Sequence, residues 1–150
     1  MSLTHYFEDF EIGQTFKSYG RTITETDLVM FCALVGYHTP MFIDEHYAQT
    51  TRFKGRVVPG SLTASFSTAS IEILFRESIV AHLGNREARF LAPVRPGDTI
   101  TTHVEVIGKE DKDRPYGEVS FRDTVKNHED AIVYTVEKTT LIAKRTAKAS

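Results

Sequence analysis

Two short segments of the sequence carry the residues best suited to chemistry. Tyr37 and His38 lie in a loop, and the imidazole group of a histidine titrates near neutral pH, which suits proton transfer. Gly60 precedes a run of helical periodicity, where free amide N–H groups and the positive end of the helix dipole can stabilise an oxyanion. Neighbouring residues of an extended loop point in opposite directions, so Tyr37 and His38 are not both expected to face one site. The sequence therefore predicts a carbonyl-binding site at Gly60, with a plain loop-to-helix turn as the alternative.

A short helix must position the loop that carries Tyr37. Thr24 and Asp27 have the spacing of a capping box, and apolar residues recur at helical spacing until Gly36, which is suited to a left-handed stop. This pattern predicts a buried helix over residues 25–35. The carboxylate of Asp44 predicts the start of a second short helix, over residues 45–49.

The main helix is expected from Ser61 to about Val80, with apolar residues over more than half of its circumference. Other elements should therefore wrap it. The C-terminal half changes to the alternating period of antiparallel strands with one buried face, and strands are expected over residues 89–94, 100–107, 119–122 and 132–137. A long buried helix and an antiparallel sheet indicate an α+β domain that occupies residues 1–150, in which residues 1–3 are interpreted as a leader segment.

Composition excludes several classes of function. The chain has 150 residues, 41% of them hydrophobic, and a formal net charge of −2, which leaves no basic excess for nucleic acid. Its longest apolar run, over residues 28–35, is much shorter than the roughly 20 residues of a membrane span. Cys32 is the single cysteine, so no internal disulfide can form, and we expect a cytoplasmic protein. The six histidines lack metal-ligand spacing, so neither a metal nor another cofactor is expected.

Five segments together resemble the MaoC-like dehydratases, whose best-known members are (R)-specific enoyl-CoA hydratases. The resemblance extends over most of the chain, at residues 6–13, 24–36, 44–48, 55–60 and 89–98. It implies a single hotdog domain, in which a curved antiparallel sheet wraps one central helix. It also implies an acyl-CoA or other acyl-thioester ligand and a homodimer or a higher hotdog oligomer.

The sequence departs from the family at the loop that carries its acid-base pair. Family members have a loop of the type Gly-Asp-x-Asn-Pro-x-His-x-Asp, and this chain keeps Gly36, Pro40 and Asp44 of it. Tyr37 stands at the position of the aspartate and Phe42 at that of the histidine. Phenylalanine cannot transfer a proton, a phenol is a weak base at neutral pH, and each positioned acid or base contributes roughly 10²–10⁴ in rate. This departure counts against the family's usual hydration mechanism.

The resemblance also indicates which residues contact the ligand. Tyr37, His38 and the Gly60 amide are the candidate catalytic groups. The candidate substrate-binding residues are Phe42, Pro59, Ser61, Thr68, Arg52 and Arg56. Pro59 replaces the histidine that often precedes the glycine, and the two arginines can hold the phosphates of CoA.

Three hypotheses about function follow. The first is a hydratase or dehydratase of an acyl thioester with relocated acid-base groups. The second is a non-catalytic acyl-thioester-binding subunit that pairs with an intact hotdog hydratase chain. The third is an acyl-CoA thioesterase that uses Glu72, although the spacing of Glu72 from Gly60 favours a solvated glutamate.

Overall fold

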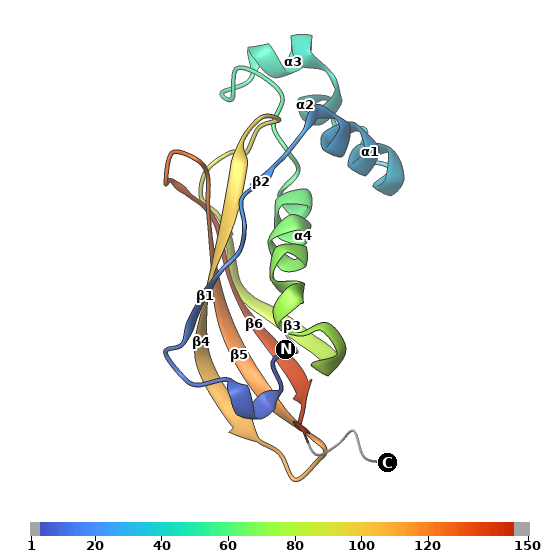
Figure 1. The fold of residues 1–150 in the computed structure, drawn as a ribbon. Coiled ribbons are helices and arrows are strands. Elements are labelled where there is room, and N and C mark those ends of the chain that lie inside the picture. Colours follow the sequence, from blue (N-terminus) through green and yellow to red (C-terminus); the bar gives the residue numbers. More distant parts are fainter. Residues whose placement is uncertain (1–3, 146–150) are drawn as a thin grey trace.

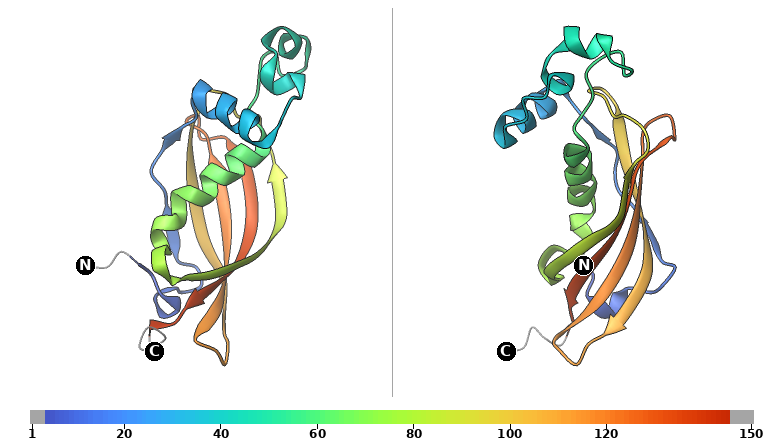
Figure 2. Two further views of the ribbon diagram at one scale, coloured as in Figure 1. Left: turned by 90° about the vertical axis from the view of Figure 1, so that its right-hand side faces the viewer. Right: turned by 180° about the vertical axis from the view of Figure 1, so that it is seen from behind.

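The computed structural model describes residues 4–145, so residues 1–3, interpreted above as a leader, lie outside it. One helix lies across the concave face of a curved antiparallel sheet, and three shorter helices gather at one end (Figures 1 and 2). In chain order the elements are η1 (Phe7–Asp9), β1 (Thr15–Lys17), β2 (Arg21–Thr22), α1 (Glu25–Val35), α2 (Pro40–Ile43), α3 (Glu45–Thr50), α4 (Gly60–Ile71), η2 (Glu72–Leu74), η3 (Arg76–Ser78), β3 (Ile79–Phe90), β4 (Thr99–Asp111), β5 (Tyr116–Lys126) and β6 (Ile132–Ala143).

The sheet has the strand order β1-β4-β5-β6-β3, with β2 paired to the far end of β4. All its pairings are antiparallel, and the three long C-terminal strands follow one another as hairpins. Buried and less buried residues alternate along β4, β5 and β6, so one face of each strand is turned toward α4. The α+β prediction is confirmed, and so are the strands expected over residues 100–107, 119–122 and 132–137, each of which extends beyond its predicted range.

Local sequence signals determine the bounds of α1. Asp27 donates its amide N–H to the Thr24 hydroxyl at 3.1 Å, and its carboxylate accepts the Thr24 amide at 2.8 Å, which completes the predicted capping box. Gly36 ends the helix in the left-handed conformation, with φ of 73°. The predicted start of α3 is also confirmed, since Asp44 accepts the amide N–H of Tyr47 at 2.9 Å.

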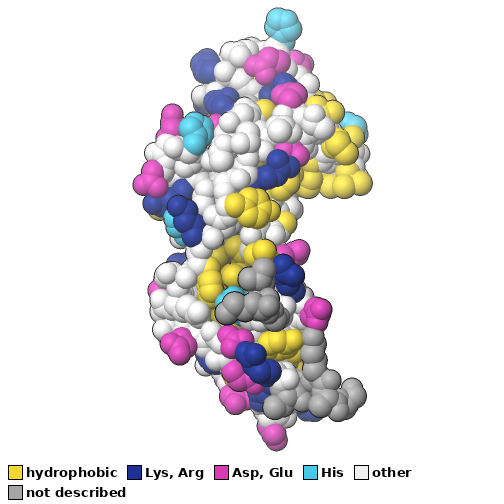
Figure 3. Space-filling view, in the orientation of Figure 1, with side chains coloured by type: hydrophobic (Ala, Val, Ile, Leu, Met, Phe, Trp, Pro, Cys, Tyr) yellow, Lys and Arg dark blue, Asp and Glu magenta, His cyan; other side chains and the backbone are white. Residues whose placement is uncertain are grey.

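The prediction that α1 is buried is wrong for much of its surface. Leu28 and Cys32 are buried, but Met30 is 66% exposed and Leu34 is 84% exposed. Hydrophobic side chains gather over α1 on the face shown in Figure 3. The prediction took apolar residues all round a helix to mean burial, whereas the fold places α1 beyond the end of the sheet, where a single chain covers only one side.

The central helix ends nine residues earlier than predicted. It runs from Gly60 to Ile71, and the chain then passes through two short 3₁₀ turns, where Arg76 takes a positive φ of 43°, into β3. The strand predicted over residues 89–94 is therefore misplaced, because β3 ends at Phe90. Ile71 and Phe75 belong to the same buried cluster, so tertiary packing and not a local breaker turns the chain here.

The interior contains two apolar clusters separated by a band of polar residues. Between the apolar residues of the two clusters stand buried polar residues: Thr102 on β4, Asp123 on β5, and Lys138 and Thr140 on β6. From α4, Ser67 and Ser70 join this band, and hydrogen bonds of 3.1 and 3.2 Å connect them to Thr102. Lys138 donates to Asp123 at 2.5 Å, so the two buried charges compensate each other.

Candidate active site

A cavity of about 660 Å³ lies where α4 begins, and we call it the site cavity. Its walls come from the loop after α1, from α2, from the loop between α3 and α4, and from the end of β3 and the residues after it. Most of the lining is apolar, and the lining residues are Tyr37, Met41, Phe42, Arg52, Phe53, Val57, Val58, Pro59, Gly60, Ser61, Thr63, Phe90, Leu91, Ala92, Pro93, Val94 and Val133. A mostly apolar cavity with a few polar groups is typical of a small-molecule site.

The start of α4 brings backbone donors into this cavity. Pro59 precedes the helix and makes no side-chain cap, and the first amide groups of a helix have no partners within it. A Cβ atom on Gly60 would lie 2.7–3.0 Å from three ring atoms of Phe90, so the ring rests directly on this glycine. A larger residue at position 60 would therefore clash with the ring of Phe90, and the absence of a side chain also lets a ligand approach the Gly60 amide.

Two hydroxyl groups face the site cavity beside that helix start. The Ser61 hydroxyl lies 3.5 Å from the Tyr37 hydroxyl, at the limit of a hydrogen bond. The ring of Tyr37 also lies 5.8 Å from that of Phe42, centre to centre. The structure thus brings together six residues that the sequence singled out, all of which line the site cavity: Tyr37, Phe42, Arg52, Pro59, Gly60 and Ser61.

His38 lies apart from this group. It lines a separate cavity of about 290 Å³ that also contacts Cys32, and Tyr37 and Phe42 form a wall shared by the two cavities. Tyr37 thus lines both cavities, whereas His38 lines only the smaller of the two, so the expectation that these neighbours face different sites holds for the site cavity alone. Burial raises the pKa of the Cys32 thiol, against a smaller opposing effect of Arg56, and favours an inert packing role.

The two predicted CoA-binding arginines have different surroundings. Arg52 lines the site cavity and lies over the ring of Phe53, with 4.7 Å between the guanidinium carbon and the ring centre. Arg56 instead forms ion pairs with Glu25 at 2.7 Å and Glu45 at 3.1 Å, and the hydrogen bond with Glu25 raises the pKa of its guanidinium. Arg56 therefore connects α1 and α3 to the loop that precedes α4.

Thr68 and Glu72 lie away from the site cavity. Thr68 accepts a hydrogen bond from Lys138 at 2.9 Å and donates one to the carbonyl of Ala64 at 3.0 Å, so it belongs to the polar band beneath the helix. Glu72 stands in the 3₁₀ turn after α4 and lines a different hollow, beside Ile73 and Arg76. Neither residue is among those that line the cavity at Gly60.

Three residues of this region were missed from the sequence. Phe53 and Phe90 line the site cavity, and Arg95 donates hydrogen bonds to the carbonyl oxygens of Phe53 and Arg56 from behind the loop. Phe90 had been assigned only to a predicted strand, and nothing local distinguished Arg95 from the other surface arginines. Their roles depend on a loop and a strand end that meet only in the fold.

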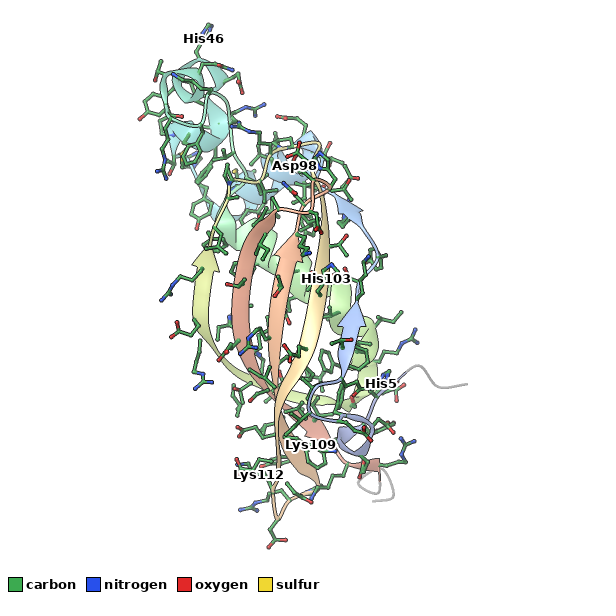
Figure 4. All side chains as sticks on the ribbon, turned by 90° about the vertical axis from the view of Figure 1, so that its left-hand side faces the viewer. His5, His46, Asp98, His103, Lys109 and Lys112 are labelled. Atoms are coloured by element: carbon green, nitrogen blue, oxygen red, sulfur yellow. The ribbon has the colours of Figure 1, made fainter. Side chains whose placement is uncertain are left out.

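The described histidines do not form a metal site. His5, His46 and His103 lie at well-separated levels of the molecule (Figure 4). Over residues 4–145, no group of three histidine, cysteine, aspartate or glutamate side chains is placed to hold a metal ion. Within the same range, no helix has the length and hydropathy needed to cross a membrane.

A curved antiparallel sheet around a central helix, with a cavity at the start of that helix, defines a single hotdog domain. A Mycobacterium tuberculosis protein described as having a double hotdog fold superposes on 94% of this chain with a TM-score of 0.86, at 22% identity over 44% of its own length. The chain belongs to the MaoC-like family, since residues 9–129 match the model of the MaoC like domain.

Two further relatives agree with this assignment. An (R)-specific enoyl-CoA hydratase of Rhodospirillum rubrum is 40% identical over 106 residues, which cover 71% of this chain and 72% of the hydratase. The structure of a monoamine oxidase regulatory protein from Archaeoglobus fulgidus matches with a TM-score of 0.88 at 33% identity, covering 96% of this chain and 98% of that one. Both the family and the fold expected from the sequence are thereby confirmed.

Proposed function

We propose that this protein binds an acyl-CoA or another acyl thioester, with the thioester carbonyl at the Gly60 and Ser61 amides and the acyl group in the site cavity. The observation that carries this proposal is the position of a mostly apolar cavity directly over the start of α4. Free amide groups at a helix N-terminus favour a polarised carbonyl oxygen, and the apolar walls favour an acyl group beside it. The enoyl-CoA hydratase relative supports the same class of ligand.

The chemistry favoured by the family is hydration of an enoyl thioester or the reverse dehydration. In that reaction water adds a hydroxyl group at C3 and a proton at C2, so a group in the site must pass a proton. Tyr37 and Ser61 are the candidates, because their hydroxyl groups lie 3.5 Å apart in the site cavity. His38 is the weaker candidate of the two predicted catalytic residues, since it lines the neighbouring cavity.

A specific observation favours a second candidate, a non-catalytic subunit. The described residues that line the site cavity include no histidine, aspartate or glutamate. The resemblance to the family likewise places Phe42 where other members have a histidine. A chain of this kind would bind the thioester and pair with a hotdog chain that retains both acid-base residues.

The open edge of the sheet supports an oligomer in either case. Among the described strands, β3 pairs only with β6, so none of them covers its other edge, and its apolar residues include Val80, Leu83 and Phe90, which are exposed. Because Phe90 also lines the site cavity, a second hotdog chain paired along β3 would lie beside that cavity.

We propose a homodimer through this edge of the sheet. Light scattering on the wild type and on Leu83→Asp tests it, and the variant should be monomeric. A wild type that is monomeric at micromolar concentration would refute it.

Two assays separate the candidates. Calorimetric titration with a saturated acyl-CoA tests binding, and loss of enoyl-CoA absorbance tests hydration. For an enzyme we expect turnover that Tyr37→Phe and Ser61→Ala each reduce at least tenfold, while His46→Ala, the control at an exposed histidine outside the site cavity, leaves it unchanged. Binding without turnover supports the subunit, and absence of binding refutes the proposal as a whole.

A further inference from the structure

The site cavity has four aromatic walls, which come from four different parts of the chain. Tyr37 lies in the loop after α1, Phe42 in α2, Phe53 in the loop after α3, and Phe90 at the end of β3. The other described residues that line the cavity are mainly aliphatic, and none of them is aromatic.

Each of the four rings is also braced by a second flat group. Tyr37 has Phe31 and Phe42 beside it, Phe53 has a guanidinium group over its ring, and Phe90 stacks on Tyr134 with only 17° between the ring planes. The separations are 6.2 Å for Phe31–Tyr37, 5.8 Å for Tyr37–Phe42, 4.7 Å for Arg52–Phe53 and 4.6 Å for Phe90–Tyr134. Rings that are already held in place lose little freedom when a ligand binds.

The ring of Phe90 lies against Gly60, the residue at the proposed carbonyl position. It packs on Gly60 so closely that a methyl group there would meet it at 2.7 Å. An acyl group whose carbonyl is at the start of α4 would therefore have the ring of Phe90 beside its first few carbon atoms. A flat ring two or three atoms from the carbonyl can make edge or stacked contacts there, which a linear chain cannot.

We propose that the preferred ligand is an arylacyl thioester, with an aromatic ring a few atoms beyond the carbonyl group. This inference rests on the proposed acyl-thioester function and specifies the acyl group. Each ring-to-ring contact is expected to tighten binding by roughly two- to tenfold beyond the burial of area. The site would thus favour an aryl group over a linear alkyl group with the same number of carbon atoms.

A matched pair of ligands tests the acyl preference. 3-Phenylpropanoyl-CoA and nonanoyl-CoA both have nine acyl carbons. Neither has a double bond between C2 and C3, so neither can be hydrated during calorimetric titration. Because the linear chain has the larger apolar surface, burial of area alone predicts that nonanoyl-CoA binds more tightly. We expect the aryl thioester to bind at least fivefold more tightly. Free CoA is the third probe and reports binding of the nucleotide alone.

Variants locate the source of the preference. Phe90→Leu and Phe53→Leu should each lower the aryl-to-alkyl ratio several-fold and leave the affinity for nonanoyl-CoA within about twofold. Tyr19→Leu, at an exposed tyrosine outside the site cavity, is the control and should keep the wild-type ratio. Circular dichroism of each variant checks that it is folded.

The outcomes separate the two proposals. Equal or tighter binding of nonanoyl-CoA overturns the arylacyl inference and leaves acyl-thioester binding supported. If both thioesters bind only as tightly as free CoA, the acyl group is not recognised, and the arylacyl inference fails together with the assignment of the site cavity. If neither thioester binds, the proposed function itself is refuted. An aryl preference that survives both phenylalanine variants also overturns the inference, because it would arise elsewhere.

Discussion

Replacement of Lys138 by methionine should strongly destabilise the protein. The Lys138 side chain is 7% exposed, that of Asp123 is fully buried, and their charged atoms are 2.5 Å apart. The other carboxylate oxygen of Asp123 has no hydrogen-bond partner, so the ammonium group of Lys138 is its main compensation. Removal of one member of a buried ion pair typically costs about 3–5 kcal/mol. With an unfolding entropy of about 2 cal/mol/K per residue, this corresponds to a decrease in Tm of roughly 10–16 °C.

The pH dependence of this variant gives a second test. Burial raises the pKa of Asp123, and Lys138 opposes that rise. Without Lys138 the folded-state pKa of Asp123 should rise further above its unfolded value of about 3.9. A carboxyl group with a raised pKa in the folded state costs stability as the pH rises through that pKa. The deficit of Lys138→Met relative to the wild type should therefore be largest at pH 7 and should shrink toward pH 5.

Urea unfolding at several pH values measures both effects. Lys138→Met with Asp123→Leu removes the pair together and should recover most of the loss, because an apolar replacement of a whole buried pair is often neutral. Arg86→Met removes an exposed partner of Glu137 and should cost less than about 1 kcal/mol. If Lys138→Met costs no more than Arg86→Met, or if its deficit does not depend on pH, the reasoning is wrong.

Three further predictions concern the site and its frame. Gly60→Ala forces the adjacent aromatic ring to move and should cost about 1–3 kcal/mol in urea unfolding and weaken acyl-thioester binding in calorimetry. Hydrogen bonds from Gln49 and Arg56 lower the pKa of Glu45, so the ionised group stabilises the fold above about pH 4.3 and this contribution is lost as the pH falls through the folded-state pKa. In Glu45→Gln the free energy of unfolding should therefore fall less steeply with decreasing pH than in the wild type, and an equally steep fall counts against the prediction. Arg95→Met removes the donor to two carbonyl oxygens of the loop between α3 and α4, and should speed amide hydrogen exchange in residues 51–58. Unchanged exchange would mean that these hydrogen bonds do not stabilise the loop.

Local signals explain which elements could be predicted. Thr24, Asp27 and Gly36 determine α1 through contacts within a few residues of each other, and the structure has them as expected. The end of α4 has no such signal, because neither glycine nor proline follows Ile71. The chain turns there because packing at the end of the sheet requires it, and Arg76 accepts a positive φ as a result.

The candidate site was predictable in part for a similar reason. Tyr37, Phe42 and Gly60 could be identified because they occupy positions of a sequence motif, and all three line the site cavity. Phe53 and Phe90 could not, since a phenylalanine in a loop or at a strand end carries no sequence signal of its own. Their role arises from the meeting of distant segments.

The hydrogen bonds of Arg95 to the loop between α3 and α4 have a consequence for engineering. They hold the backbone of the cavity wall through a side chain that does not itself line the site cavity. Side chains on the inner side, such as Phe53 and Met41, can therefore be exchanged in a directed-evolution library without loss of the frame that carries them. A library that keeps Arg95 and varies these inner positions should yield folded proteins with new acyl preferences more often than one that varies Arg95 as well.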